Sequence, residues 1–229
     1  MKNISFIIPA YNEEKSIRTA IEEVLKYADE NLDTCEVIVV DDGSADGTAT
    51  YASAYPDQRV KLIKHKTNKG KGAAVKTGVD AATGEWIIFL DADLSTHPRD
   101  VETLKPFAHT HDIMIGSRAL PESNLTKRQP KRRELQGRLF NKVIKKFLGL
   151  PFEDTQCGFK AFHKKTKHIF SALQTDGWIF DVELLKFAQK NGYSIKEVPI
   201  TWQDDPDSRV RSSHAIQILR DLYNAKRRI

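Results

Sequence analysis

Short apolar runs alternate with segments of helical periodicity through the first half of the chain. From residue 17 to 28 apolar side chains recur every three or four positions, which predicts an amphipathic helix. The predicted strands lie at 4–8, 36–40, 60–63, 85–90 and 113–116. Further helices are predicted at 48–55, from a glycine-rich turn at 68–72 to about residue 82, and from Pro98 onward. This pattern is typical of an α/β fold with a mostly parallel sheet covered on both faces.

Composition narrows the class of protein. At roughly 150 residues per domain, the 229 residues fit one α/β domain with an added C-terminal element. The 40% hydrophobic and 29% charged residues are ordinary for a globular protein. No apolar run approaches the roughly 20 residues of a membrane-spanning helix, and we expect no secretory signal. Cys35 and Cys157 are too few for a disulfide framework, which favours a reducing, cytoplasmic compartment.

The positive charge gathers in one window of the sequence. The formal net charge is +5, yet residues 127–146 contain nine Lys or Arg against one acid, Glu134. This window therefore carries +8 and the remainder of the chain −3. A local basic patch indicates a polyanionic partner, which could be nucleic acid, anionic lipid or a phosphate-bearing substrate. The alternative is a solvated basic face of a helix.

Polar residues gather where the predicted strands end. The first strand leads into residues 9–13, the second into 41–44 and the strand at 85–90 into 91–93. In open parallel sheets, ligands bind beyond the carboxyl ends of the strands. One acidic strand end could be a helix cap, but three on the same edge favour a binding site.

Asp91 and Asp93 follow a buried strand with one residue between them, so an extended chain would place both carboxylates on one side. Paired carboxylates suit a hard divalent cation, because Mg²⁺ typically takes one or two carboxylates together with substrate phosphate oxygens. A general acid/base pair is the alternative. No Gly-x-Gly-x-x-Gly motif follows the first strand, and the turn at 68–72 lacks the arrangement of a phosphate loop. With both motifs excluded, the remaining possibility is a nucleotide site built from carboxylates, a metal ion and basic side chains.

Motifs along the chain resemble glycosyltransferase family 2, whose members have the GT-A fold. In the first half they are Pro9-Ala10-Tyr11-Asn12-Glu13-Glu14, Asp41-Asp42-Gly43-Ser44, Asn68-x-Gly70-Lys71-Gly72 and Asp91-Ala92-Asp93. In the second half, Gly116-Ser117-Arg118 and the segments 132–141, 154–160 and 178–185 resemble the polyprenyl-phosphate sugar transferases. Within that group they are most similar to dolichyl-phosphate glucosyltransferases, with dolichyl-phosphate mannose synthases as relatives. The resemblance extends from residue 4 to about residue 211.

The resemblance implies the residues of a donor site. The nucleoside pocket would be lined by Pro9, Ala10, Tyr11, Glu13 and Asp42, and Lys71 would join the nucleotide-sugar site. Asp91, Ala92 and Asp93 would hold the donor diphosphate together with a Mg²⁺ or Mn²⁺ ion. Ser95 stands where the mannose synthases have a glutamine that completes the metal shell, and it is the candidate third ligand.

The same resemblance implies a set of cations. Arg118 would face the reacting phosphates, and Arg132 or Arg133 would receive the phosphate of the lipid acceptor. Arg209 lies where these enzymes have a lysine in a late loop that closes on the diphosphate, and arginine keeps the charge but alters the geometry. Asp93, Arg118 and Arg209 are therefore the expected catalytic residues. Asp181 and Glu183 are either helix-opening acids that favour the helix dipole or direct participants.

The implied reaction is an inverting displacement, in which a polyprenyl or dolichyl phosphate attacks the anomeric carbon of a nucleotide sugar. A phosphate monoester is largely a dianion at neutral pH, so this nucleophile needs no general base. We expect a hexose transfer with UDP-glucose as donor. A GDP-mannose-dependent mannose synthase, or a family 2 enzyme with a different acceptor, is the alternative. The expected single domain, 1–229, comprises a nucleotide-sugar half at 1–117 and an acceptor half with a C-terminal helix at 118–229.

The basic window also predicts a membrane contact. Between 132 and 150, apolar residues recur at helical spacing with basic residues between them, which is typical of an interfacial amphipathic helix. A core-packed helix with a solvated basic face is the alternative. We expect a peripheral protein at the cytoplasmic face of an anionic membrane, with a membrane protein as a further candidate partner. Many relatives carry C-terminal membrane helices, and the sequence leaves open whether this chain is naturally peripheral or a shortened form.

Two rival classes of protein are considered. A nucleotidyltransferase that makes sugar nucleotides would also use metal-binding carboxylates, but a glycine-rich loop with basic residues is expected there in place of Pro9-Ala10-Tyr11. A nucleic-acid-binding module explains the basic window but leaves three acidic strand ends unexplained, because carboxylates without a metal repel phosphate. We therefore expect no nucleic-acid partner.

Overall fold

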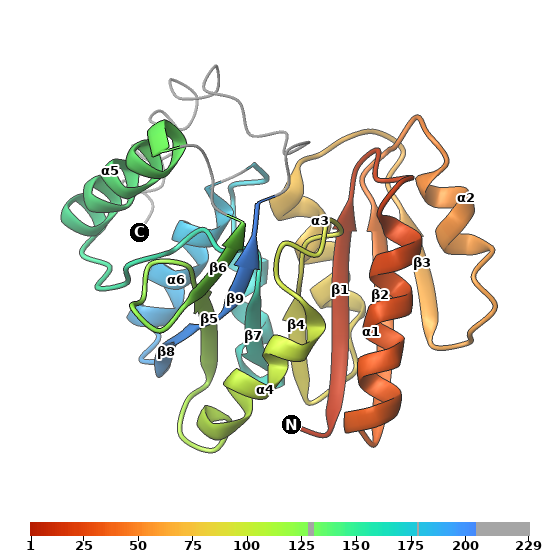
Figure 1. The fold of residues 1–229 in the computed structure, drawn as a ribbon, viewed down its shortest axis with the longest axis horizontal. Helices are drawn as coiled ribbons and strands as arrows, with labels where there is room; N and C mark the ends of the chain where they lie inside the picture. The colour runs from red at the N-terminus through yellow and green to blue at the C-terminus, as the bar shows by residue number, and fades with distance from the viewer. Residues whose placement is uncertain (128–130, 178, 205–229) are drawn as a thin grey trace.

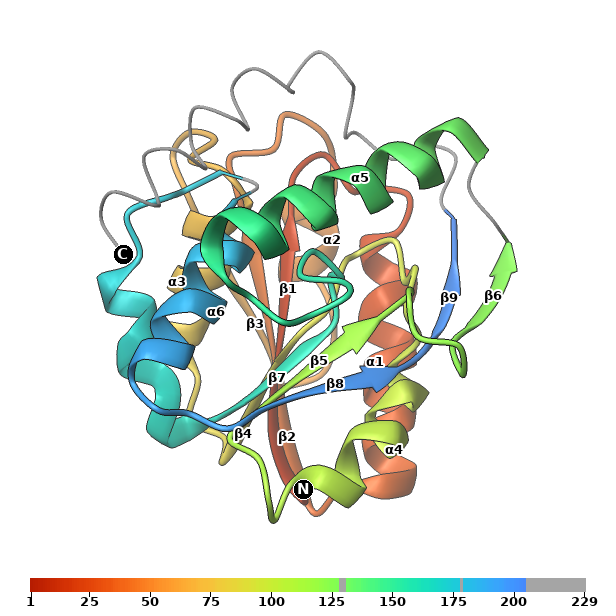
Figure 2. The same cartoon turned by 90° about the vertical axis from the view of Figure 1, so that its left-hand side faces the viewer.

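The computed structural model describes residues 1–127, 131–177 and 179–204, with the backbone alone at 131–136, 138 and 140. A seven-stranded sheet forms its centre, and helices cover both faces (Figures 1 and 2). The strands are β1 (Asn3–Ala10), β2 (Thr34–Asp41), β3 (Val60–Lys64), β4 (Trp86–Phe89), β5 (Ile113–Ser117), β6 (Asn124–Lys127), β7 (Lys160–His163), β8 (Ile195–Pro199) and β9 (Thr201–Gln203). The α-helices are α1 (Ile17–Asn31), α2 (Thr48–Ser53), α3 (Lys71–Ala81), α4 (Val101–Leu104), α5 (Lys131–Leu148) and α6 (Phe180–Lys190). The predicted α/β class is confirmed.

The strand order of the large sheet is β3-β2-β1-β4-β7-β5-β8. Strand β7 is antiparallel to β4 and β5, and the other described pairings in this sheet are parallel. The register pairs Ala10 with Asp41 and Ile7 with Phe89. The chain segments that follow β1, β2 and β4 therefore begin side by side at one edge, as the sequence predicts.

Each central strand divides its side chains between two cores, because successive residues of a strand point to opposite faces. On β1, Ile4, Phe6 and Ile8 join the core under α1, and Ile7 joins the core under α3 and α6. The apolar positions of α1, including Ile17, are fully buried in the first core. Both faces of the sheet are therefore closed, and ligands can reach it only at its edges.

Strand β7 joins the two predicted halves of the chain. It follows residue 117 in sequence, yet it lies between β4 and β5, which both precede it. The sheet is therefore common to both halves, and the division at residue 117 stays a prediction about donor and acceptor binding.

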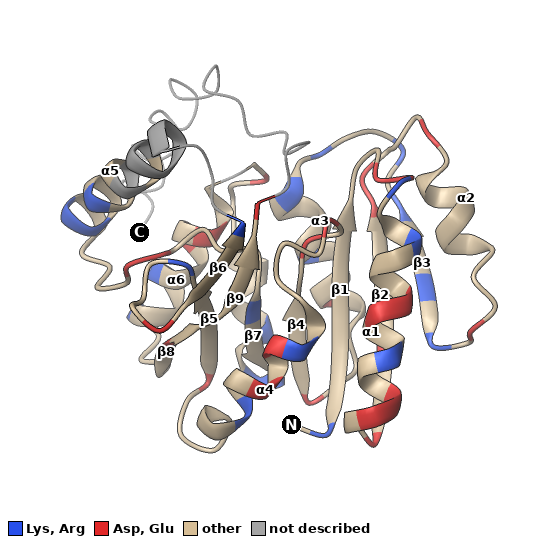
Figure 3. Ribbon diagram, in the orientation of Figure 1, with Lys and Arg blue, Asp and Glu red and all other residues tan. Residues whose placement is uncertain are grey.

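Helix α5 divides the predicted apolar stripe between core and solvent. Ile144 and Leu148 are buried, whereas Leu139 is 63% and Val143 41% exposed. Basic residues occupy the C-terminal part of the same helix (Figure 3). In both cartoon views α5 lies at the end of the molecule toward which β1 points (Figures 1 and 2). Within the described residues, no helix has the length and apolar character needed to cross a membrane.

Candidate active site

The loops after β1 and β2 are hydrogen-bonded to each other. The amide of Asn12 donates to Ser44 Oγ at 2.8 Å, and the amide of Ala45 donates to Asn12 Oδ1 at 2.8 Å. Asn12 has a φ of 54°, a left-handed conformation that asparagine tolerates better than most residues. The amide of Glu13 donates to Thr48 Oγ1 at 2.7 Å. These bonds fix the two loops against each other, and together the loops form the floor of the site at this edge of the sheet.

Four predicted nucleoside contacts lie on or beside this floor. Ala10 is buried, Pro9 and Glu13 are partly buried, and the Tyr11 side chain is 39% exposed. The carboxylate of Glu13 accepts a hydrogen bond from Ser16 Oγ at 2.7 Å. The structure thus brings these residues together, and their contact with a nucleoside stays a prediction.

Asp42 supports the glycine-rich turn in this structure. Its Oδ1 accepts from the amide of Lys69 at 2.9 Å and lies 2.7 Å from His65 Nδ1, and its Oδ2 accepts from the amide of Gly70 at 2.8 Å. The Asp42 side chain is only 4% exposed. Both carboxylate oxygens are therefore engaged within the protein. The predicted nucleoside contact stays a prediction, and positioning of the turn is the role that the geometry shows.

The glycine-rich turn packs against a later segment of the chain. Gly70 has a φ of 103°, and a Cβ there would lie 2.4 Å from the carbonyl oxygen of Asp176. That carbonyl accepts the amide of Gly72 at 2.8 Å. Close backbone approach therefore explains the glycine at position 70, and Lys71 begins α3 directly beyond it.

Asp91 and Asp93, referred to below as the acid pair, lie in a tight turn after β4. The amide of Leu94 donates to the carbonyl oxygen of Asp91 at 3.1 Å, and the amide of Ser95 donates to Asp93 Oδ1 at 2.8 Å. Leu94 has a φ of 52°, a strained conformation for leucine. Ala92 between the two acids is buried. Strain of this kind persists where surrounding contacts impose it, and it clusters at functional sites.

Opposite charges surround the acid pair. Lys71 Nζ lies 2.5 Å from Asp91 Oδ1. Burial lowers the pKa of Lys71, but the charges of Asp91 and Asp181 outweigh this effect and raise it. Burial and the neighbouring charge of Asp91 raise the pKa of Asp93 to about 6. The carboxylates therefore repel each other, and an added cation would relieve that repulsion.

The acid pair fits a divalent cation. Hard cations of this kind take oxygen ligands, and Mg²⁺ typically uses one or two carboxylates with phosphate oxygens of a substrate. In the part of the chain that the structure describes, no group of three or more His, Cys, Asp or Glu side chains forms a closed metal cage. Ser95 supports Asp93 through its amide, and the role of its hydroxyl as a third metal ligand stays a prediction.

Arg118 is held by a carboxylate that sequence reasoning did not assign to the site. Its Nε donates to Asp154 Oδ2 at 2.6 Å and its Nη2 to Asp154 Oδ1 at 2.9 Å, a bidentate pair. Its guanidinium lies 5.5 Å from the centre of the Trp202 ring. The amide of Asp154 donates in turn to Glu197 Oε1 at 2.8 Å. Burial raises the pKa of Asp154, but Arg118 outweighs this and lowers it, so the pair stays ionic.

A second, buried ion pair also escaped the sequence prediction. Lys160 Nζ lies 2.6 Å from Asp181 Oδ1, and it donates to the carbonyl oxygen of Cys157 at 2.6 Å. The two side chains are 0% and 5% exposed. Glu183 accepts from the amide of Thr175 at 2.9 Å. Asp181 and Glu183 therefore do more than favour the dipole of α6: each holds another segment in place.

The remaining predicted cations are Arg132, Arg133 and Arg209. Arg132 and Arg133 lie in the first turns of α5, where the structure gives the backbone alone. Arg209 lies beyond residue 204, outside the described residues. The strand before it is fastened near the acid pair, because the amide of Gln203 donates to the carbonyl oxygen of Ser95 at 2.9 Å.

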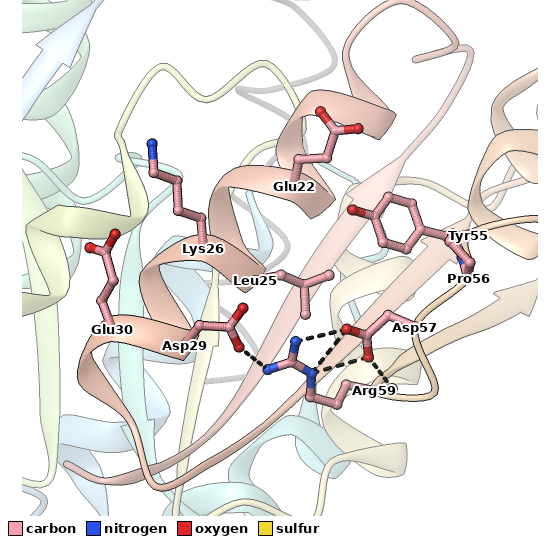
Figure 4. Close-up of a pocket in the computed structure, with 9 residues that line it drawn as sticks. All are labelled: Glu22, Leu25, Lys26, Asp29, Glu30, Tyr55, Pro56, Asp57 and Arg59. Atoms are coloured by element: carbon pink, nitrogen blue, oxygen red, sulfur yellow. Dashed lines mark hydrogen bonds and ion pairs between the residues drawn. The ribbon is translucent and has the colours of Figure 1, made fainter.

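A surface hollow elsewhere does not belong to this site (Figure 4). It lies between α1 and residues 55–59, which precede β3 and therefore lie toward the amino ends of the strands. Arg59 within it is already paired with Asp29 at 2.6 Å and Asp57 at 2.7 Å. The candidate active site is therefore the cluster at the carboxyl ends of the strands, which comprises the loops after β1 and β2, the acid pair and the nearby cations Lys71, Arg118 and Lys160.

Comparison with solved structures identifies the class of this architecture. The chain superposes on glucosyl-3-phosphoglycerate synthase from Mycobacterium tuberculosis in complex with Mn²⁺, UDP-glucose and phosphoglyceric acid, with a TM-score of 0.72 and 22% identity. The match covers 98% of this chain and 80% of that one. The same synthase with Mg²⁺ and UDP gives a TM-score of 0.70 at 20% identity. The fold is that of the GT-A glycosyltransferases, and the predicted fold is confirmed.

Sequence comparison then gives the family. The model of glycosyl transferase family 2 matches residues 5–170. Dolichyl-phosphate beta-glucosyltransferase of Dictyostelium discoideum is 32% identical over 97% of this chain and 73% of that protein. The Homo sapiens enzyme of the same name is 34% identical over 91% of this chain and 70% of that protein. The chain belongs to glycosyl transferase family 2, as its motifs predict.

Proposed function

We propose that this chain transfers glucose, with inversion, from UDP-glucose to dolichyl phosphate or a related polyprenyl phosphate. One observation carries the proposal. Its similarity to dolichyl-phosphate beta-glucosyltransferases, at 32 to 36% identity, spans 91 to 97% of the chain. The similarity therefore extends over both the acid-pair edge and the segments that hold Arg118 and Asp181.

On the donor side, Asp91 and Asp93 would hold Mg²⁺ or Mn²⁺ together with the donor diphosphate. When bound, such a cation stabilises the negative charge that develops on the departing diphosphate. Pro9, Ala10, Tyr11 and Glu13 would line the nucleoside. Support comes from the fixed loops beneath these residues, since a rigid floor holds the donor with little entropic cost on binding.

On the acceptor side, the reaction needs two anions brought together, and positioning and charge stabilisation would supply the rate. Asp154 and Trp202 fix the plane of Arg118, so this cation would orient the attacking phosphate. Arg132 or Arg133, on α5, would hold the same phosphate. Arg209, which lies outside the described residues, would stabilise the leaving group, as the family resemblance implies.

The membrane contact would be made by α5. Leu139 and Val143, one helical turn apart, are exposed on this helix, as are Lys142 and Lys146. Apolar side chains among lysines suit the boundary of an anionic bilayer, which is where a polyprenyl phosphate presents its head group. We propose a peripheral protein at the cytoplasmic face, without a nucleic-acid partner.

The test is transfer to a short, soluble polyprenyl phosphate with Mn²⁺, comparing UDP-glucose and GDP-mannose as donors. We expect UDP-glucose to be used, Asp93→Asn to abolish transfer with an unchanged circular dichroism spectrum, and excess chelator to stop the reaction. Preference for GDP-mannose would make the chain a mannose synthase. Full activity in chelator would refute the metal site.

A further inference from the structure

Lys71 connects the acid pair to the glycine-rich turn. It is the first residue of α3, and its Nζ lies 2.5 Å from Asp91 Oδ1. The Lys71 side chain is 17% exposed and that of Asp91 31%. The ion pair is therefore partly shielded from water, where a charge interaction is stronger than at an open surface.

The contact uses one of the carboxylate oxygens that a cation on the acid pair could bind. Asp91 Oδ2 lies against Gly158, only 1.8 Å from where a Cβ of that residue would be. Asp93 Oδ1 already accepts the amide of Ser95. Lys71 occupies Asp91 Oδ1, and two cations that share one carboxylate oxygen repel each other. An incoming divalent cation would therefore compete with the ammonium group.

The other described cations of the cluster have partners of their own. Arg118 is paired with Asp154, and Lys160 is buried against Asp181. Lys71 differs because Asp91, with which it forms an ion pair, is a member of the acid pair itself and is partly exposed. The side chain of lysine is also flexible, with a compact charge on four rotatable methylene groups. It can change partners without disturbing α3.

We propose that Lys71 is the resident counter-ion of the acid pair, which leaves Asp91 when a divalent cation binds and then pairs with the diphosphate of the donor. The inference rests on the proposed function, which supplies the metal and the donor. Without nucleotide, Lys71 neutralises Asp91 and weakens metal binding. With nucleotide, the displaced charge finds a new anion, so metal and donor bind cooperatively.

Calorimetric titration with Mn²⁺ alone tests the competition. Because two cations close together repel each other, Lys71→Met, which lacks the ammonium charge, should bind Mn²⁺ on the order of tenfold tighter in the absence of nucleotide. Mn²⁺ should also raise the melting temperature of Lys71→Met more than that of the parent. Lys76→Met, on the same helix and partly buried, is the matched control and should behave as the parent. Lys71→Arg keeps the charge and should restore weak binding.

Acetylation of lysines, followed by mass spectrometry, tests the change of partner. Relative to Lys76 in the same peptide digest, labelling of Lys71 should rise when Mn²⁺ is added and fall again when UDP follows. If Lys71→Met and the parent bind Mn²⁺ equally well and labelling is unchanged, the proposed exchange of Lys71 between Asp91 and the diphosphate is refuted, but the metal site is not. Absence of Mn²⁺ binding in both proteins, with or without UDP, overturns the metal site and the exchange together.

Discussion

Gly158 gives the most direct test of where the structure places Asp91. A Cβ on residue 158 would lie 1.8 Å from Asp91 Oδ2 and 2.4 Å from its Cγ, whereas real Cβ contacts essentially never fall below 3.0 Å. In Gly158→Ala the carboxylate must therefore move by about 1.2 Å or more. Asp91 is 31% exposed, so its side chain can turn toward solvent while the backbone keeps its path.

A displacement of about 1 Å costs on the order of 100-fold in rate, or about 2.7 kcal/mol in transition-state stabilisation. We therefore expect Gly158→Ala to lower kcat/KM for UDP-glucose by about 100-fold and to weaken Mn²⁺ binding. The melting temperature should change little. The assay is transfer to a short polyprenyl phosphate at saturating acceptor, with Mn²⁺ titrated for each variant.

Gly137→Ala is the matched control, because a Cβ at residue 137 meets nothing within 4 Å. Alanine in that helical position should stabilise the protein by about 0.5 to 1 kcal/mol and leave transfer unchanged. If Gly158→Ala retains the kcat/KM and Mn²⁺ affinity of the parent, the placement of Asp91 in the site is refuted. A large loss of melting temperature would instead show that the backbone, and not the side chain, gives way.

Three further predictions concern charge. Lys160→Met should lower the free energy of unfolding by about 3 to 5 kcal/mol in urea titrations, because it leaves Asp181 buried without its partner; a loss below 1 kcal/mol would contradict a buried pair. Replacing Lys142, Lys145 and Lys146 by glutamine should weaken the free energy of binding to anionic vesicles, measured by co-sedimentation, by up to about 1 kcal/mol per residue, and should spare transfer to a short acceptor. Replacing Arg132 and Arg133 should impair that transfer too. Equal transfer by both sets of variants would refute the role of the arginines in acceptor binding. Burial raises the pKa of Glu36, but hydrogen bonds from Lys61, Ser5 and Thr83 outweigh it and lower the pKa to about 2. Its contribution to stability is therefore present above about pH 4.5 and is lost as the pH falls toward 2. Glu36→Gln should be less stable at pH 7 and should show a flatter dependence of unfolding free energy on pH between pH 5 and 3, whereas parallel curves for variant and parent would exclude this carboxylate as the cause.

The sequence predicts the first half of the fold well, because its strands are continuous apolar runs separated by periodic helices. It does not predict the strands β6, β7, β8 and β9. Lys160, a charged residue at the start of β7, breaks the apolar run, and its burial depends on Asp181, which lies in a helix far along the chain. No local sequence pattern predicts such a pairing.

The candidate site shows the same division between local and distant information. Asp91 and Asp93 are recognisable from their spacing at a strand end. The partners that position the site residues, such as Asp154 for Arg118, come from segments that only the folded sheet brings together. A glycine between a buried cysteine and a phenylalanine gives no sign, in sequence, that it leaves room for a carboxylate 67 positions earlier.

The place of β7 between β4 and β5 also fixes the order in which the chain can fold during synthesis. Phe89 of β4 pairs with Lys160, so β4 has no partner on that side until β7 has left the ribosome. At about 5 to 20 residues per second, an apolar strand edge stays open for on the order of 4 to 15 s. Such an edge is a template for pairing with other chains. The nascent chain therefore passes through a period in which its central sheet is half built.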